Sequence, residues 1–115
     1  MILVIGGYAS GKRTYVKETY GHTDNDLADG VLDGKPVVYN LQNLIMGDLA
    51  GIEAMIPDLL KKEVVICNEM GSGIIPLSKQ DRELREAAGR LCVLLAKEAK
   101  RVVRVVCGLP VVLKG

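Results

Sequence analysis

The fold class of this chain is decided near its beginning, by the sequence Ile2-Leu3-Val4-Ile5-Gly6-Gly7-Tyr8-Ala9-Ser10-Gly11-Lys12-Arg13-Thr14. A short apolar run ends in glycine, as expected for a β-strand that is covered on both faces of a parallel sheet. The spacing of Gly6, Gly11 and Lys12 is typical of a phosphate-binding loop between a strand and a helix. We therefore expect a strand over residues 1–5, this loop, and a helix over residues 11–20.

The loop predicts a nucleotide-binding site. Without Cβ atoms, consecutive backbone N–H groups can converge on phosphate oxygens at the positive end of the following helix. Lys12 adds a charge that would reach the terminal phosphates and stabilise them during phosphoryl transfer, so we expect it to be a catalytic residue as well. The predicted nucleotide-binding residues are Gly6, Gly7, Tyr8, Ala9, Ser10, Gly11, Lys12, Arg13 and Thr14.

The last position of the pattern departs from the usual motif. A Ser or Thr hydroxyl normally follows the lysine and binds Mg²⁺, whereas Arg13 has only hydrogen-bond donors and cannot bind a cation. Thr14 has a hydroxyl, but one helical step rotates its side chain by about 100°, so we expect it to point elsewhere. We assign no metal ligand; Mg²⁺ remains a candidate whose usual ligands are altered.

Composition limits the class of protein. A length of 115 residues predicts one nucleotide-binding domain over residues 1–115. The balance of 15 basic and 14 acidic residues argues against a nucleic-acid surface driven by net charge. No apolar run reaches the roughly 18 residues that cross a membrane, and we expect a cytoplasmic protein.

The core is expected to be aliphatic, because the chain has no Phe or Trp. The three cysteines, Cys67, Cys92 and Cys107, are odd in number and lie in apolar stretches. This pattern favours reduced core thiols over disulfides or a metal site.

The rest of the chain alternates apolar runs with helical patterns. Strands are expected over residues 36–40 and 63–68, two short helices with a joint near Gly47 lie between them, and a long helix follows Ser78. Runs at residues 102–107 and 111–113, joined by residues 108–110, predict a hairpin, and residues 21–35 predict a loop or a short irregular element. We therefore expect an α/β, three-layer sandwich of the P-loop NTPase-like class, with a mostly parallel sheet and a C-terminal antiparallel hairpin.

Several blocks of the second half resemble one enzyme family. They are Asn68-Glu69-Met70-Gly71-Ser72-Gly73-Ile74-Ile75-Pro76, then Ala88-Gly89-Arg90, and Gly108-Leu109-Pro110-Val111-Val112-Leu113-Lys114. In order and spacing they resemble the bifunctional adenosylcobinamide kinase/adenosylcobinamide-phosphate guanylyltransferases, as do the glycine-rich loop and the stretch from Val37 to Leu49. The resemblance implies cobalamin biosynthesis, a homotrimer, and ATP or GTP as phosphate donor to the aminopropanol hydroxyl of adenosylcobinamide. It also implies GMP transfer through a guanylylated histidine.

The chain differs from that family at several positions. Residues 21–35 replace a strand and the helix that carries the nucleophilic histidine, and the only histidine, His22, lacks a matching motif. Asn40 stands where the family has an acidic residue, and an amide binds Mg²⁺ less well than a carboxylate does. Cys92 and Val93 replace an Asn-Gln pair.

Glu69 is the second predicted catalytic residue. It follows a predicted buried strand, where its carboxylate could orient the acceptor hydroxyl or a metal-bound water, or could merely cap backbone donors. Three functions stay open: a cobinamide kinase in which guanylyl transfer is doubtful, a degenerate relative that binds nucleotide or corrinoid without catalysis, and a small nucleotide kinase with another acceptor.

Overall fold

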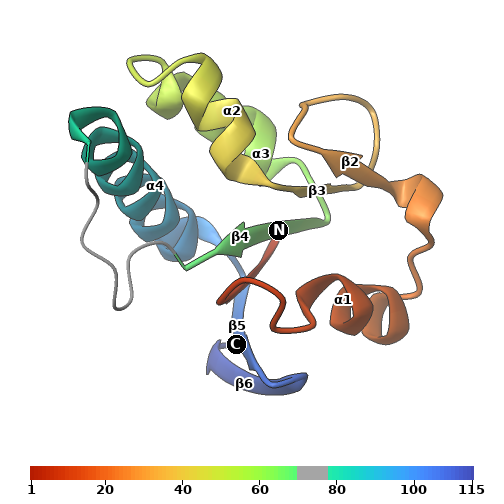
Figure 1. Ribbon diagram of the computed structural model, residues 1–115. Helices are drawn as coiled ribbons and strands as arrows, with labels where there is room; N and C mark the ends of the chain where they lie inside the picture. The colour runs from red at the N-terminus through yellow and green to blue at the C-terminus, as the bar shows by residue number, and fades with distance from the viewer. Residues whose placement is uncertain (70–77) are drawn as a thin grey trace.

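A computed structural model of the chain describes residues 1–69 and 78–115, apart from the side chain of Asp81. The described residues form a sheet of six strands in the order β2-β3-β4-β1-β5-β6 (Figure 1). The strands are β1 (Ile2–Gly6), β2 (Leu27–Asp29), β3 (Val37–Tyr39), β4 (Val64–Asn68), β5 (Arg101–Val106) and β6 (Leu109–Lys114).

The central strands run parallel and end together. β1 lies between β4 and β5, with Ile2 paired to Val64 and Gly6 paired to Asn68. β6 runs antiparallel to β5 and forms the C-terminal hairpin, so the predicted sheet is confirmed. We call the end of the sheet where β1, β3 and β4 finish its carboxyl end, and the opposite one its amino end.

Helices cover both faces of the sheet, as a three-layer fold requires (Figure 1). On one face α1 (Lys12–Tyr20) places Val16 among buried residues that include Val4 and Val103. The other face carries α2 (Leu41–Gly47), α3 (Ile56–Leu60) and α4 (Lys79–Glu98), with short 3-10 helices at η1 (Asp24–Asp26) and η2 (Ile52–Met55) elsewhere in the chain.

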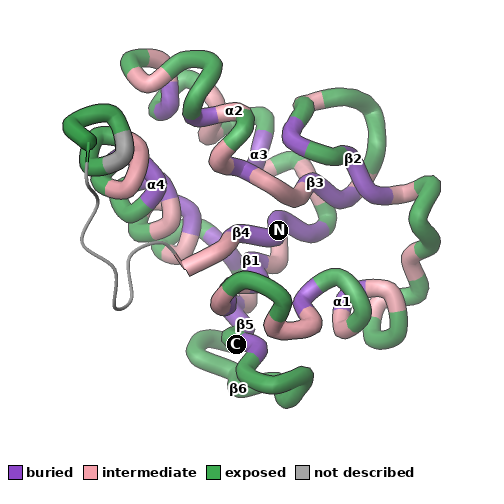
Figure 2. The backbone as a smooth tube through the Cα atoms, in the orientation of Figure 1, coloured by how far each residue is buried: buried purple, intermediate pink, exposed green. Residues whose placement is uncertain are grey.

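The core is aliphatic, as predicted. Its largest fully buried side chains are leucine, isoleucine and valine, and each such burial contributes about 1.5–3 kcal/mol. Leu91 and Leu95 of α4 pack with Leu3 of β1 in the larger cluster, and the joint expected near Gly47 separates α2 from η2. Figure 2 shows the buried strands at the centre and β6 exposed along its length.

Helix α4 begins directly after Ser78, as predicted, and the N–H of Arg82 donates to the carbonyl of Ser78 (3.2 Å). Residues 70–76 of the block that resembles the enzyme family lie outside the described residues. In the part of the chain that is described, no helix combines the length and apolarity needed to cross a membrane.

Two local predictions are wrong. Residues 21–35 contain a strand, β2, whose Leu27 and Ala28 are buried beside β3; three residues are too few to show a strand pattern. The hairpin turn is Cys107-Gly108 rather than residues 108–110, because both residues adopt the positive φ (51° and 76°) that suits a tight two-residue turn.

Cys107 is consequently exposed in that turn, so the prediction of a core thiol is wrong at this position. Cys67 is buried and Cys92 is half-buried, and all three cysteines are free thiols.

Candidate functional site

The glycine-rich loop, residues 6–14, lies at the carboxyl end of the sheet and lines a cavity of about 360 Å³. The lining brings together seven of the nine predicted nucleotide-binding residues with residues from the ends of β3 and β4. It consists of Tyr8, Ala9, Ser10, Gly11, Lys12, Arg13, Thr14, Tyr39, Asn40, Ile66 and Asn68. Gly6 and Gly7 are not part of the lining.

Glycine is required at two positions of the loop. A Cβ at Gly6 would lie 2.6 Å from both the Ser10 hydroxyl and the carbonyl oxygen of Val105 in β5. Gly11 has a φ of +92°, which L side chains rarely adopt, and it precedes the first residue of α1. The spacing that predicted the loop therefore has a steric cause.

The turn of the C-terminal hairpin, Cys107-Gly108, contacts the glycine-rich loop. The backbone N–H of Gly108 donates to the carbonyl of Ser10 (2.9 Å), and a Cβ at Gly11 would meet the Cα of Gly108 at 3.3 Å. Sequence reasoning missed this contact, because nothing in a hairpin pattern shows which loop its turn will touch.

Lys12 is buried, with 6% of its surface exposed, although it is a charged residue. Its Nζ donates to the carbonyl of Gly7 and to the Ser10 hydroxyl (3.4 Å), so the side chain is hydrogen-bonded within its own loop. Burial lowers the pKa of Lys12, and the nearby Cys67 and Glu69 oppose that shift. A ligand with negative charge in the cavity would favour the protonated amine.

Arg13 and Thr14 both line the cavity. The Arg13 guanidinium carbon lies 5.0 Å from the centre of the Tyr39 ring, so a cation–π contact directs Arg13 toward β3. Thr14 lies in the first turn of α1, and the direction of its hydroxyl stays a prediction.

Asn40 contacts a carboxylate that sequence reasoning did not single out. Its Nδ2 donates to Oδ1 of Asp29 (2.6 Å), which stands at the end of β2. Asp29 was missed because β2 was taken as a loop; the available signal was an acidic residue directly after the apolar pair Leu27-Ala28. Among the described residues, no group of three or more His, Cys, Asp or Glu side chains could hold a metal ion.

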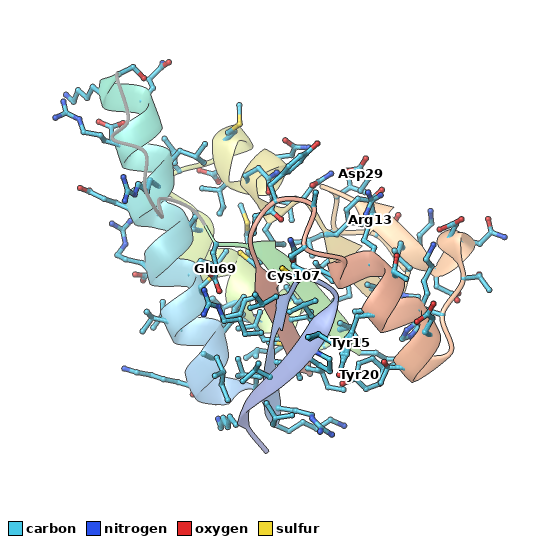
Figure 3. All side chains as sticks on the ribbon, turned by 60° about the horizontal axis from the view of Figure 1, so that its bottom comes forward. Arg13, Tyr15, Tyr20, Asp29, Glu69 and Cys107 are labelled. Carbon is cyan, nitrogen blue, oxygen red and sulfur yellow. The ribbon has the colours of Figure 1, made fainter. Side chains whose placement is uncertain are left out.

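Glu69 lies beside the loop but does not line its cavity. The Glu69 N–H donates to the carbonyl of Gly6 (2.7 Å), while its carboxylate accepts from Nε (2.6 Å) and Nη2 (3.1 Å) of Arg104. These hydrogen bonds raise the pKa of Arg104. In Figure 3 Glu69 is well separated from Arg13. The acid predicted for catalysis is therefore occupied by an ion pair.

His22 lies at the other end of the sheet. Its Nε2 is 3.3 Å from Oε2 of Glu63, and the carbonyl of Glu63 accepts from the N–H of Ile2, where β1 begins. The five residues of β1, at about 3.3 Å each, separate this pair from the glycine-rich loop. The structure thus does not bring His22 to the cavity.

The comparisons with known proteins identify the family. The model of the cobinamide kinase / cobinamide phosphate guanyltransferase family, CobU, matches residues 33–113. The chain belongs to this family. The resemblance stated from its second half is confirmed, and the matched range runs from before β3 to within β6.

A curated member of the pathway is also similar. The bifunctional adenosylcobalamin biosynthesis protein CobP of Pseudomonas aeruginosa is 32% identical over 69 residues, which cover 60% of this chain and 40% of that protein. The match thus spans less than half of the relative. The glycine-rich loop precedes the range of the family match and is a separate observation.

Proposed function

We propose that this chain, as one nucleotide-binding domain over residues 1–115, uses ATP or GTP to phosphorylate the aminopropanol hydroxyl of adenosylcobinamide. The observation that supports this most strongly is a buried lysine in a glycine-rich loop that lines a cavity, in a chain of the cobinamide kinase family. Nucleotide and corrinoid are then its two small-molecule partners.

In the proposed reaction, backbone N–H groups of residues 7–12 bind the β- and γ-phosphates at the start of α1. Lys12 exchanges its contacts with Gly7 and Ser10 for phosphate oxygens, and its charge then stabilises the transition state. The acceptor oxygen attacks the γ-phosphorus, the bond to the β-phosphate oxygen breaks, and a nucleoside diphosphate leaves.

Glu69 would orient the acceptor hydroxyl and take its proton. Its carboxylate must first leave Arg104, which is half-exposed and can turn toward solvent or toward a phosphate. Arg104 would then be available to the negative charge that builds up during transfer. Binding of the substrate would thus separate Glu69 from Arg104 and leave the Glu69 carboxylate able to act as the base.

The chain offers oxygen atoms that fit Mg²⁺. Mg²⁺ prefers oxygen ligands, which hydroxyl, amide and carboxylate groups supply. Near the same end of the sheet there is a hydroxyl on Thr14, an amide on Asn40 and a carboxylate on Asp29. When bound with the nucleotide, the metal would neutralise charge on the β- and γ-phosphates. Asp29 would supply the carboxylate that Asn40 lacks.

A second candidate function is binding of nucleotide or corrinoid without catalysis. Arg13 and Asn40 both alter the usual metal ligands, and Arg104 occupies Glu69. The proposal ends at the kinase step, because the only histidine of the chain lies at the amino end of the sheet.

We also propose that the chain assembles with copies of itself in the cytoplasm. Strand β6 exposes apolar side chains on a strand that has no partner on its outer side among the described residues. Large exposed apolar surfaces of this kind mark contacts with other chains. Light scattering during size-exclusion chromatography should give the mass of a trimer, and a Val111→Lys substitution should release monomers.

Thermal unfolding of the full chain tests the proposed function. ATP or GTP at ten times its dissociation constant should stabilise the fold by about 1.4 kcal/mol, which raises the melting temperature by several degrees. Incubation with adenosylcobinamide, ATP or GTP and Mg²⁺ should then give the phosphorylated corrinoid. A thermal shift without product would favour the non-catalytic function, and no shift with any nucleotide would contradict both.

A further inference from the structure

Two cysteines from different layers of the fold meet at the carboxyl end of the sheet. Cys67 belongs to β4 and Cys92 to α4, and their sulfur atoms are 2.9 Å apart. Both are free thiols. Neither thiol lines the cavity of the glycine-rich loop, and the proposed function assigns the pair no role.

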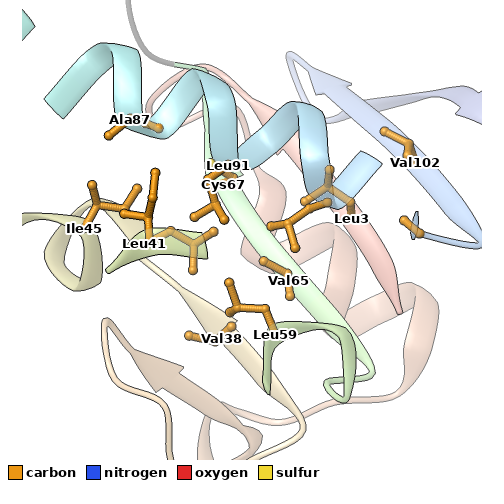
Figure 4. Packing of buried hydrophobic residues seen from close by; sticks show 14 of the residues in the cluster. Leu3, Val38, Leu41, Ile45, Leu59, Val65, Cys67, Ala87, Leu91 and Val102 are labelled. Carbon is orange, nitrogen blue, oxygen red and sulfur yellow. The ribbon is translucent and has the colours of Figure 1, made fainter. Parts of the chain in front are cut away.

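The two thiols differ in access. Cys67 is 4% exposed and lies under α4 beside Leu91, as Figure 4 shows. Cys92 is half-buried and lines a cavity of about 190 Å³ with Asn68 and Glu69. Cys92 therefore borders a cavity large enough for a peroxide, whereas Cys67 is almost fully buried.

The contact also shifts the pKa values of the two thiols in opposite directions, which indicates that one attacks the peroxide and the other then forms the disulfide. The hydrogen bond from Cys67 lowers the pKa of the Cys92 thiol, although burial and the charge of Glu69 oppose that shift. The same hydrogen bond, together with burial, raises the pKa of Cys67. The more accessible sulfur is thus the one with more thiolate character.

We propose that Cys67 and Cys92 form a reversible disulfide when the protein meets a peroxide, joining β4 to α4. The Cys92 thiolate attacks one oxygen of hydrogen peroxide, the O–O bond breaks, and a sulfenic acid forms; the leaving hydroxide takes up the proton that the Cys92 thiol released, which gives water. The Cys67 sulfur then attacks the sulfenic sulfur; the S–S bond forms, the S–O bond breaks, and hydroxide leaves with the Cys67 proton as a second water. The two sulfurs together give two electrons to the peroxide, and an added dithiol returns them.

The crosslink would act next to the candidate site. Asn68, the neighbour of Cys67, lines the cavity of the glycine-rich loop, and the N–H of Glu69 donates to Gly6. The disulfide would hold the end of β4 against α4, so the oxidised protein should resist thermal unfolding better than the reduced one. This effect does not require that the cavity bind a nucleotide.

Hydrogen peroxide, added to the full chain with a Cys107→Ser substitution, tests the proposal. Digestion and mass spectrometry should find a peptide pair joined through Cys67 and Cys92, lighter by two hydrogen atoms, and dithiothreitol should separate it. The melting temperature should rise on oxidation and return on reduction. Recovery of overoxidised Cys92 with Cys67 still reduced, or of crosslinks between chains only, would overturn the proposal.

Single substitutions separate the two roles. In a Cys67→Ala variant, Cys92 should stop at the sulfenic acid, which dimedone traps. In a Cys92→Ala variant, Cys67 should react with peroxide at least about tenfold more slowly than Cys92 does in the parent, because burial both limits access to the Cys67 sulfur and raises its pKa without any help from Cys92. Equal rates for the two thiols would contradict the assignment.

Discussion

Each end of the sheet borders a cavity, but the residues that line the two cavities differ in their chemistry. The larger cavity, about 550 Å³, lies at the amino end, where Pro36 and Glu63 precede β3 and β4. Lys62, one of its lining residues, donates to the backbone carbonyls of Asp33 and Lys35 and so connects two segments of the chain. The smaller cavity at the carboxyl end is lined by Lys12 and its glycine-rich loop, where α1 begins.

The volume of a cavity therefore does not identify the candidate site. In a parallel sheet the carboxyl ends of the strands lead into loops and helix N-termini, where backbone donors favour an anion. At the amino end the backbone donors that begin β1 and β4 are already used, in the hydrogen bonds from Ile2 to Glu63 and from Val64 to Pro36. We therefore expect only the carboxyl end to respond to a nucleotide.

The largest effect on ATP binding is expected when a lysine at the carboxyl end, Lys12, is replaced, with a lysine at the amino end, Lys62, as the comparison. Lys12→Ala should weaken ATP binding about 100-fold, because charge-assisted hydrogen bonds to the phosphates contribute about 1.5–3 kcal/mol. Lys62→Ala should leave the affinity unchanged, although Lys62 also makes two hydrogen bonds. Isothermal titration calorimetry measures both, and equal losses in the two variants would remove the distinction between the ends.

Two glycines provide the next comparison. Gly6→Ala should destabilise the fold by about 1–3 kcal/mol, because its Cβ would meet the backbone oxygen of Val105. Gly34→Ala at the amino end should change the melting temperature little, since a Cβ there meets no atom within 4 Å. Thermal unfolding of both variants is the measurement, and a stable Gly6→Ala variant would contradict the packing described for the loop.

Restoring the usual metal ligands should give a smaller gain. The double variant Arg13→Ser, Asn40→Asp should bind ATP about tenfold more tightly with Mg²⁺ than without it, because a hydroxyl and a carboxylate then face the cavity. His22→Ala, at the amino end, is the control and should not change this ratio. A double variant indifferent to Mg²⁺ would show that these positions do not hold the metal.

The smallest effect is expected in the segment that follows α1. The hydrogen bond from Lys17 lowers the pKa of the Asp24 carboxyl. A lowered pKa in the folded state stabilises the protein above the ordinary value for Asp, and this contribution is lost as the pH falls through the lowered value. Asp24→Asn should therefore reduce the melting temperature slightly at pH 7 but not in strong acid.

Because Asp24 is fully exposed, 1 M NaCl should abolish the difference at pH 7. ATP affinity should be the same in both proteins. A difference that persists in salt would mean that Asp24 acts through something other than its ion pair.

Much of the fold could be predicted because its signals are local. An apolar run that ends in glycine identified β1, and the apolar positions at helical spacing identified α4. Strand β2 was missed because three residues carry no periodicity, and its burial depends on β3 beside it. Asp29, which contacts Asn40, was missed with it.

The glycine-rich loop, the aliphatic core and the family can be recognised from the sequence alone, since each follows from residues close together in the chain or from blocks in a recognisable order. The contacts that those residues make became known only with the fold. The pairing of Glu69 with Arg104, the contact between Cys67 and Cys92, and the contact between His22 and Glu63 all join segments far apart in the chain. Such contacts depend on strand order and register, which a pattern along one chain does not contain.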